Sequence, residues 1–446
     1  MFRRLQLLIL AGILVIAAFS SGKDFLFYLV YLGVLVIGGS YVLTRLGLAD
    51  LEAGYAVSQL SGHVGDRIQV TYTLRNTSRV PKPWLEVHNP TSLPAGLPGR
   101  GLSLSGRTER SWQIRSLLTR RGHFRIEPLQ IRTGDPFGFF ESSASVGSGI
   151  NVTVYPRLEP LPLWRLPASN LDGSHAMRER TLQATPLATT VRPWAPGDAF
   201  NRIHWKSTAR HGDIQVKEFD LEQTADAWIV LDLERAAQRG TGDESTVEVA
   251  VRVAAAVADK ALVENRAVGM TVSAHRLGQL QPDRGGRQHL KVMQLLAAVE
   301  GDGAIPLTEA LVASVQRIRR GMTAVIITAS LDRDWVKPLA ALRSRGVACV
   351  VVALDVAAFE RHARETAARE QQEPVGFVSV LVRPEDEAPT RAAPAAATSS
   401  ATSAEVPESE IASAKHARAL RHALAEYEIA VYQVGPTSPL AKALAS

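Results

Sequence analysis

The sequence predicts three parts in order: a two-helix transmembrane hairpin, an all-β immunoglobulin-like sandwich and a doubly wound α/β domain. Three observations predict them. Two apolar runs without any charge occupy residues 5–20 and 25–44. Runs of period two fill residues 50–160, and strand-like runs alternate with helix-like runs from residue 225 onward.

The two apolar runs predict membrane helices at about 5–21 and 25–45, within a hairpin that covers residues 1–48. A membrane-spanning helix needs roughly 17–25 apolar residues, so the second run is long enough and the first is slightly short. A cleaved secretory signal peptide is therefore the alternative for the first run. No clean small-x-small cleavage pattern precedes the turn between the runs, which favours the hairpin.

The charges that flank the two runs predict the orientation of the hairpin. Arg3 and Arg4 precede the first run, and Arg45 follows the core of the second. The turn between them holds only Lys23 beside Asp24. The positive-inside rule therefore predicts that both ends of the hairpin, and the body that follows it, are cytoplasmic.

Cysteine content and net charge agree with that location. Cys349 is the only cysteine among 446 residues, which excludes an intramolecular disulfide framework. It lies in the apolar run VACVVVAL and is predicted to be a buried core residue. The formal net charge of +6 favours attraction to anionic membrane lipid, or simply a solvated surface, over a nucleic-acid partner.

The rest of the chain divides by pattern into five segments. Residues 50–160 predict the β-sandwich, and 161–224 form a weakly periodic linker that includes a distinctive segment. Residues 225–384 predict the doubly wound α/β domain. Residues 385–410 are rich in Ala, Pro, Ser and Thr and predict a disordered insertion. Residues 411–446 predict a last helix and strand that complete the α/β domain.

The distinctive segment covers residues 191–220, where aromatic side chains alternate with basic ones. One interpretation is nucleic-acid binding, with bases stacked on the aromatic rings. A second is catalysis, which would use Asp198, His204, His211 and Asp213 as acid–base or metal groups. The third is a rigid connector whose Trp194 and Trp205 are buried and whose Arg and Asp residues pair locally. Interspersed carboxylates would repel phosphate, and no metal-site spacing is present, so the connector is favoured.

The segment RPWAPGDAFNRIHWKSTAR, residues 192–210, followed by AWIVLDL, resembles the signature of the bacterial domain of unknown function 58 family. GDPFGFF (134–140) and VYPR (154–157) are similar to the turn and strand that precede this signature. The resemblance covers all parts of the chain except the Ala/Pro/Ser/Thr-rich insertion. It implies a protein of the bacterial cytoplasmic (inner) membrane. The signature and interaction residues are Arg192, Trp194, Gly197, Asp198, Arg202, Ile203, Trp205, Lys206 and Arg210.

The resemblance further implies that the α/β domain is von Willebrand factor A-like, a fold that often binds a divalent metal through oxygen ligands. Asp232 matches the first ligand of that site, but Glu234 and Ala236 replace the two serines. Ile305 stands where the threonine is expected, and residues 329–330, Ala and Ser, stand where the aspartate is expected. We therefore expect a degenerate site with Asp232 as its remnant, no metal and no cofactor. Asp232 is expected to pair with an arginine of the signature instead.

The expected function is that of a membrane-anchored, non-enzymatic adaptor that presents a protein-interaction platform. The resemblance implies a MoxR-type AAA+ ATPase as its partner, in cell-envelope or assembly processes. The alternative is a membrane-bound, hydrolase-like enzyme that uses Asp198, His204 and Asp213. Convergence of these three in one pocket would favour the enzyme, whereas dispersal of the three with buried Trp194 and Trp205 would favour the adaptor.

Overall fold

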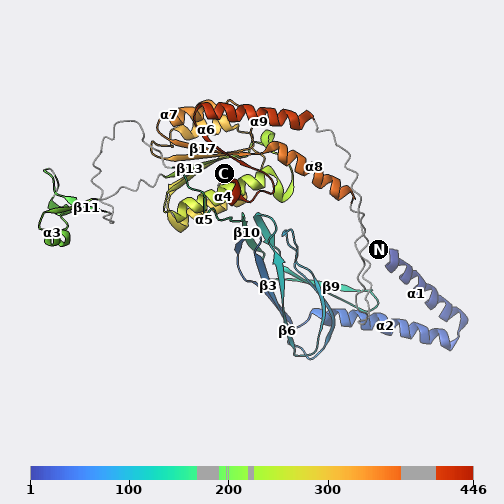
Figure 1. Ribbon diagram of the computed structural model, residues 1–446. Coiled ribbons are helices and arrows are strands. Elements are labelled where there is room, and N and C mark those ends of the chain that lie inside the picture. Colours follow the sequence, from blue (N-terminus) through green and yellow to red (C-terminus); the bar gives the residue numbers. More distant parts are fainter. Residues whose placement is uncertain are drawn as a thin grey trace, which may run out of the picture. The chain divides into compact units, whose positions relative to one another are not determined.

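The protein is described by a computed structural model, which divides into two compact units. Unit 1 comprises Met1–Leu158 with Met293–Val299, and unit 2 comprises Glu159–Val292 with Glu300–Ser446. Each unit is described by itself below (Figure 1). The structure describes residues 2–167, 190–196, 198, 200–218, 226–372 and 408–444.

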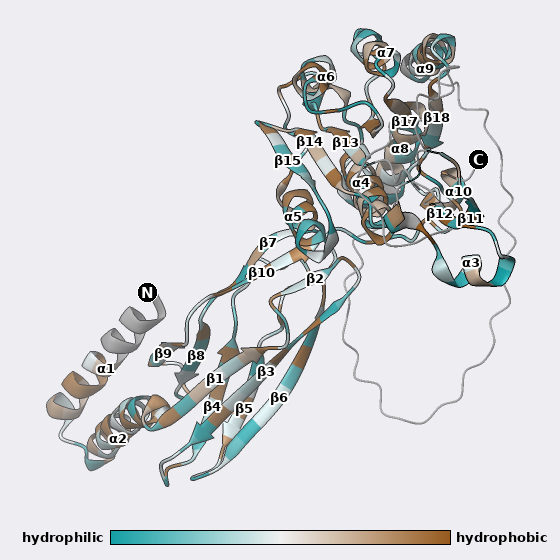
Figure 2. Cartoon of the chain, turned by 90° about the vertical axis from the view of Figure 1, so that its left-hand side faces the viewer, coloured by the Kyte–Doolittle hydropathy of each residue, from teal (hydrophilic) through white to brown (hydrophobic). Residues whose placement is uncertain are grey.

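Unit 1 opens with two helices, α1 (Phe2–Ser21) and α2 (Asp24–Leu48), which pack together across a short turn. Gly22 allows the turn because it adopts a φ of 61°, where a side chain would be strained. Phe19 and Phe27 meet edge to face, with ring centroids 5.3 Å apart. In the described part of the chain, α2 alone is long and apolar enough to cross a membrane. Its apolar surface is largely uncovered (Figure 2).

The β-rich region of unit 1 forms three sheets, in the orders β1-β3-β6, β5-β4-β8-β9 and β2-β10-β7. All neighbouring pairs are antiparallel except β2 with β10. This confirms the β-rich region that the period-two runs predict, while its immunoglobulin-like topology stays a prediction. The strands are β1 (Leu51–Val57), β2 (Ser61–His63), β3 (Arg67–Asn76), β4 (Lys82–His88), β5 (Arg100–Leu104), β6 (Glu109–Leu117), β7 (Gly122–Ile126), β8 (Leu129–Gly134), β9 (Glu141–Val146) and β10 (Ile150–Tyr155).

One hydrophobic core joins these sheets, and the alternation along β3 shows how it forms. Ile68, Val70, Tyr72 and Leu74 are buried, whereas the residues between them point to the other face. Side chains from the other two sheets enter the same core, which is why the region folds as layers. These side chains include Leu85, Val87, Leu129, Ile131, Ile126, Val152 and Val154.

The α/β part of unit 2 is built on a six-stranded sheet of order β15-β14-β13-β16-β17-β18. All neighbours are parallel except β15, which runs antiparallel to β14 at the edge. Every residue of β13 is buried, as expected of a central parallel strand covered on both faces. The strands are β13 (Ala227–Asp232), β14 (Val268–Ser273), β15 (Leu277–Asp283), β16 (Thr323–Thr328), β17 (Ala348–Leu354) and β18 (Ala430–Val434).

Helices cover this sheet, with α4 on one face and α6, α7 and α9 on the other (Figure 1). Ser245 begins α4 by accepting a hydrogen bond from the backbone N–H of Glu248. The helices are α4 (Thr246–Val263), α5 (Gly285–Ala298), α6 (Leu307–Val315), α7 (Val336–Ser344), α8 (Val356–Gln372), α9 (Glu408–Glu426) and α10 (Leu440–Ala443).

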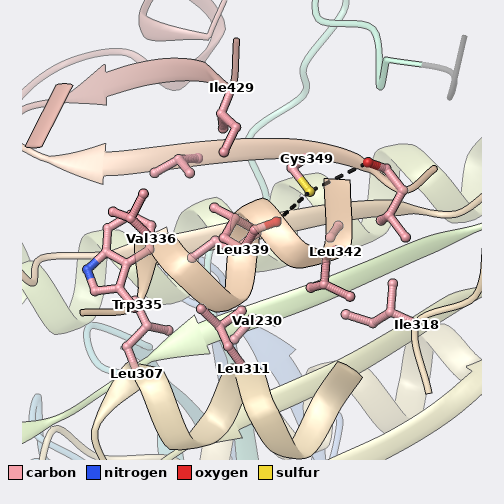
Figure 3. Close-up of a cluster of buried hydrophobic side chains, with 14 of the residues drawn as sticks. Val230, Leu307, Leu311, Ile318, Trp335, Val336, Leu339, Leu342, Cys349 and Ile429 are labelled. Carbon is pink, nitrogen blue, oxygen red and sulfur yellow. Dashed lines mark hydrogen bonds between the residues drawn. The ribbon is translucent and has the colours of Figure 1, made fainter. Parts of the chain in front are cut away.

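Cys349 lies in the core between this sheet and its helices, among Leu339, Leu342 and Ile429 (Figure 3). Its side chain is buried and forms no disulfide. Burial raises the pKa of the Cys349 thiol to about 12, so the reactive thiolate is not populated near neutral pH. The prediction that Cys349 is a buried core residue is confirmed.

The two predicted irregular segments lie partly outside the described residues. Residues 168–189, 197, 199 and 219–224 of the linker are not described, and neither are residues 373–407, which hold most of the predicted insertion. After this second gap, α9 leads into β18, which pairs in parallel with β17. Strand β18 therefore belongs to the same sheet as β13, α9 packs on the core of that sheet, and the short helix α10 follows β18.

Candidate functional site

The signature residues form a small group of secondary-structure elements between two stretches that the structure does not describe, residues 168–189 and 219–225. Strands β11 (Thr190–Pro193) and β12 (Gln215–Glu218) pair antiparallel. Between them lie the short 3₁₀ helix η1 (Phe200–Arg202) and α3 (Trp205–His211). Ile203 and Val216 are the buried apolar side chains of this group, and their backbones form an isolated β-bridge. We call residues 190–218 the signature module.

An ion pair closes the Pro-Gly-Asp turn of the signature module. Arg192 donates from both terminal nitrogens to the two carboxylate oxygens of Asp198, each at 2.8 Å. The same carboxylate accepts a hydrogen bond from the backbone N–H of Ala195 at 2.9 Å. A bidentate pair of this kind fixes orientation as well as distance. Asp198 therefore holds the turn against β11, as the predicted local pairing of Arg and Asp requires.

His204 has a structural role at the start of α3. Its Nδ1 lies 2.6 Å from the hydroxyl of Ser207 and accepts a hydrogen bond from the Ser207 backbone N–H. The His204 carbonyl accepts the hydroxyl of Thr208, whose oxygen in turn accepts the N–H of Gln215 at 3.0 Å. These contacts cap α3 and attach it to β12. His204 therefore uses the Nδ1 atom of its ring to cap α3.

The aromatic side chains of the signature module are exposed, which contradicts the predicted burial of its tryptophans. Trp205 is 70% exposed and Phe200 is 74% exposed, while Trp194 is 36% exposed. The backbone N–H of Trp194 donates a hydrogen bond to the carbonyl of Ile214 at 2.8 Å. The prediction failed because an aromatic pattern marks apolar surface but does not say whether another element covers it.

The remaining predicted signature residues divide into three kinds. Ile203 is buried, whereas Lys206 and Arg210 are exposed on α3. Gly197 lies outside the described residues, and only the backbone of Arg202, in η1, is described.

The three residues of the enzyme alternative make separate contacts. Asp198 binds Arg192, His204 binds Ser207, and Asp213 is exposed beyond the end of α3. These contacts do not join the three side chains to one another, and the exposed tryptophans do not show the burial that was expected with the adaptor.

The second candidate site lies at the carboxyl edge of the α/β sheet, around Asp232. Asp232 is 0% exposed, and one of its carboxylate oxygens accepts the hydroxyl of Thr328 at 2.6 Å. The other oxygen accepts the hydroxyl of Ser273 at 3.2 Å and the backbone N–H of Glu234 at 3.1 Å. The side chains that bind Asp232 thus come from the last residues of β14 and β16. These hydroxyls, not a signature arginine, satisfy the Asp232 carboxylate.

Burial governs the ionisation of this edge. Burial raises the pKa of Asp232, and the hydrogen bonds from Thr328, the Glu234 backbone and Ser273 only partly oppose it. Burial also raises the pKa of Glu234, and the nearby carboxylates of Asp232 and Asp332 raise it further. The edge therefore resists the accumulation of negative charge.

The residues at this edge do not fit the metal site that the family resemblance implies. A divalent cation needs an accessible, ionised carboxylate with free lone pairs. Both oxygens of Asp232 already accept hydrogen bonds and have no exposure, and burial favours the protonated form. In the described part of the chain, no group of three His, Cys, Asp or Glu side chains could hold a metal ion.

Ser273 and Thr328 are hydrogen-bond partners of Asp232 that were not predicted from the sequence. Each is the last residue of an apolar strand-like run, GMTVS or AVIIT, in the same way that Asp232 ends AWIVLD. The carboxyl ends of parallel strands meet at one edge of a sheet, so this shared position was a usable signal. Residues 329–330, where the aspartate was expected, lie just beyond Thr328, the last residue of β16.

Comparison with known proteins supports the family resemblance over part of the chain. The family model described as "Protein of unknown function DUF58" matches residues 190–361. The uncharacterized protein YeaD of Bacillus subtilis is 27% identical over 68% of this chain and 75% of its own length. The uncharacterized protein Rv1480 of Mycobacterium tuberculosis is 28% identical over 37% of this chain. The chain spans about half (53%) of that mycobacterial relative.

Solved structures resemble parts of the chain at low similarity. The CARDB domain of the PF1109 protein from Pyrococcus furiosus covers 24% of this chain and 87% of its own, with 14% identity and a TM-score of 0.18. Proximal thread matrix protein 1 from the mussel byssus covers 30% of this chain and 38% of its own, with 9% identity and a TM-score of 0.24. These values bear on neither function nor partners.

Proposed function

We propose that the protein is a membrane-anchored, non-enzymatic adaptor whose signature module binds a partner protein. The observation that carries the proposal is the exposure of Trp205 and Phe200 on a module that is held together by the Arg192–Asp198 ion pair and by the contact of His204 with Ser207. Aromatic residues are frequent anchors of protein interfaces. A two-stranded ribbon that buries Ile203 and Val216 among its described residues is also marginally stable alone, so covering its aromatic rings would stabilise it.

The anchor in this proposal is a hairpin of α1 and α2 in the bacterial cytoplasmic membrane. The length and composition of α2 support a membrane span, and the packing of α1 against it supports the hairpin. Arg3, Arg4 and Arg45 then lie on the cytoplasmic side with the β-rich region and the α/β region. Cleavage of α1 as a signal peptide would leave α2 as the single anchor.

The α/β domain supplies the second part of the platform, as a von Willebrand factor A-like domain without a metal. Its strand order supports this fold, because the first strand is central and the antiparallel strand lies at the edge. The topological switch point of such a sheet is the place where two adjacent strands connect to neighbours on opposite sides. Here it lies between β13 and β16, at the carboxyl edge that holds Asp232. Ligands of doubly wound sheets bind outside this edge, so it faces the partner.

The partner proposed from the family resemblance is a MoxR-type AAA+ ATPase. The test is cross-linking and recovery of partners from membranes that contain the full chain. The matched variants are Trp205→Ala and Val263→Ala, because Val263 is also a large, 76% exposed apolar residue but lies on α4.

Loss of an interface anchor costs about 2 kcal/mol or more, so we expect Trp205→Ala to reduce recovery of the ATPase at least about tenfold. Val263→Ala should leave recovery unchanged. Failure of the unaltered chain to recover an ATPase would reject this partner. Equal recovery with Trp205→Ala would reject the signature module as its binding site.

A further inference from the structure

The turn between β8 and β9 is an aromatic loop that is held rigid from within. Asp135 accepts hydrogen bonds from the backbone N–H of Phe137 at 2.9 Å and of Phe140 at 2.6 Å. Gly138 adopts a φ of 72°, and its N–H binds the Asp135 carbonyl at 3.1 Å. Because the carboxylate and carbonyl of Asp135 satisfy three backbone donors, the turn offers few unpaired polar groups to its surroundings.

The rings of this turn are displayed outward rather than into the β-domain core. Phe137 is 61% exposed and stacks on Phe139 with centroids 5.6 Å apart. Trp84, on the neighbouring strand β4, is 47% exposed and lies 3.4 Å from the position of a Cβ atom at Gly134. Two exposed aromatic rings and the half-buried ring of Phe139 therefore occur together at one end of the domain. We call Trp84, Phe137 and Phe139 the aromatic cluster.

The turn packs against the final part of α2. The ring of Phe140 meets the ring of Tyr41 edge to face, with centroids 5.6 Å apart. Nearer the helix end, a Cβ atom at Gly47 would lie 2.7 Å from Thr133 of β8, so only glycine permits this approach. Ser40 and Thr44 are also buried on this side of α2. The place of the turn along α2 is therefore set by direct packing of α2 against β8 and β9.

The length of α2 gives the depth at which the turn would lie in the membrane. A helix rises 1.5 Å per residue, so Tyr41 lies about 26 Å along α2 from Asp24 and Arg45 about 32 Å. The hydrocarbon core of a bilayer is about 30 Å thick. An upright α2 that enters the membrane at Asp24 would thus place Tyr41, and the Phe140 ring against it, near the cytoplasmic boundary of the hydrocarbon. Arg45, which lies over the Tyr41 ring at 5.6 Å, would lie at the headgroups.

We propose that the aromatic cluster inserts into the cytoplasmic interface of the lipid bilayer and forms a second membrane contact beside α2. Aromatic side chains are enriched at this level of the membrane, where an apolar ring borders the headgroups. The internal hydrogen bonds of the Asp135 turn reduce the cost of bringing its backbone there. The contact fixes the angle between α2 and the β-domain at the membrane surface. The inference rests on the proposed membrane anchoring of α2.

The test uses the full chain in lipid nanodiscs, with a nitroxide spin label at one introduced cysteine. The sites are Phe137→Cys in the turn, Tyr31→Cys in α2 and Ser61→Cys beside the opposite end of β3. Tyr31 is 64% exposed, and Phe137 and Ser61 are exposed, so labelling should not disturb the core. Cys349 is 4% exposed, and the labelled parent chain serves as the blank.

The readout compares relaxation by oxygen, which partitions into lipid, with relaxation by a water-soluble nickel chelate. We expect the oxygen-to-nickel ratio to be highest at residue 31 and several-fold higher at residue 137 than at residue 61. A ratio at 137 that equals that at 61, while 31 favours oxygen, would overturn lipid insertion but leave the anchor intact. A nickel-favoured ratio at 31 would overturn the anchor itself, and lipid insertion of the turn with it.

Discussion

Lys82 donates a hydrogen bond from its side-chain nitrogen to the carbonyl oxygen of Ala49 at 2.8 Å, immediately after the last residue of α2. The same nitrogen also binds the carbonyl of Leu46 in the final turn of the helix. Lys82 is 1% exposed, although it is the first residue of β4. The final carbonyls of a helix have no partner within it, and a cation there also complements the helix dipole. Lys82 therefore joins the proposed membrane helix to the β-domain.

We expect Lys82→Met to destabilise unit 1. The methionine keeps most of the side-chain volume but leaves the carbonyls of Leu46 and Ala49 without their buried donor. A buried acceptor that loses its partner costs about 1–3 kcal/mol. Thermal unfolding of the full chain in detergent, followed by circular dichroism, should show a lower midpoint for this variant.

The matched control is Lys337→Met, because Lys337 is exposed on α7. Its unfolding midpoint should match that of the parent chain. If both variants unfold at the parent temperature, Lys82 does not stabilise the end of α2.

Asp198→Ala should loosen the signature module without affecting the rest of unit 2. The change removes the acceptor for Arg192 and for the backbone N–H of Ala195. Arg192 is 40% exposed at its side chain, so solvent screening limits the ion pair to about 1 kcal/mol or less. Hydrogen exchange measured by mass spectrometry should be faster in peptides that cover β11 and the turn.

Asp213→Ala is the comparison within the same module, because Asp213 is exposed. It should leave exchange in β11 unchanged. Equal exchange in the parent chain and the Asp198→Ala variant would show that the ion pair does not hold the turn.

Asp232→Asn should change how stability depends on pH. Burial raises the pKa of Asp232 in the folded state above its unfolded value of about 3.9. The stability that the protonated carboxyl contributes is therefore full below about pH 4 and is lost as pH rises through the folded-state pKa. Asparagine cannot ionise, so the variant should lack this loss and gain stability relative to the parent chain as pH rises.

The measurement is the difference in unfolding midpoint between the parent chain and the variant, from about pH 4 to about pH 8. Asp334→Asn is the control, since Asp334 is exposed before α7. A parent–variant difference for Asp232→Asn that stays constant across this range would contradict the raised pKa.

Much of the fold was predictable because secondary structure follows from local periodicity. The charge-free run of α2, the alternation along β3 and the continuous apolar run of β13 each indicate one element from adjacent residues alone. Burial of Cys349 followed in the same way from its apolar neighbours. The signature at 192–210 could be recognised because its residue types stand at fixed spacing along one segment, and the family match begins at residue 190.

The candidate sites were harder to predict because their contacts join distant parts of the chain. The hydroxyls on Asp232 come from residues 41 and 96 positions away, and the strand order that unites them is not a local property. Exposure of Trp205 was likewise not readable from residue type. The sequence alone determined that this chain carries an apolar helix, a β-rich region and an α/β region. Only the tertiary structure decided that Lys82 caps α2 and that hydroxyls enclose Asp232, because chain topology, not spacing, brings those groups together.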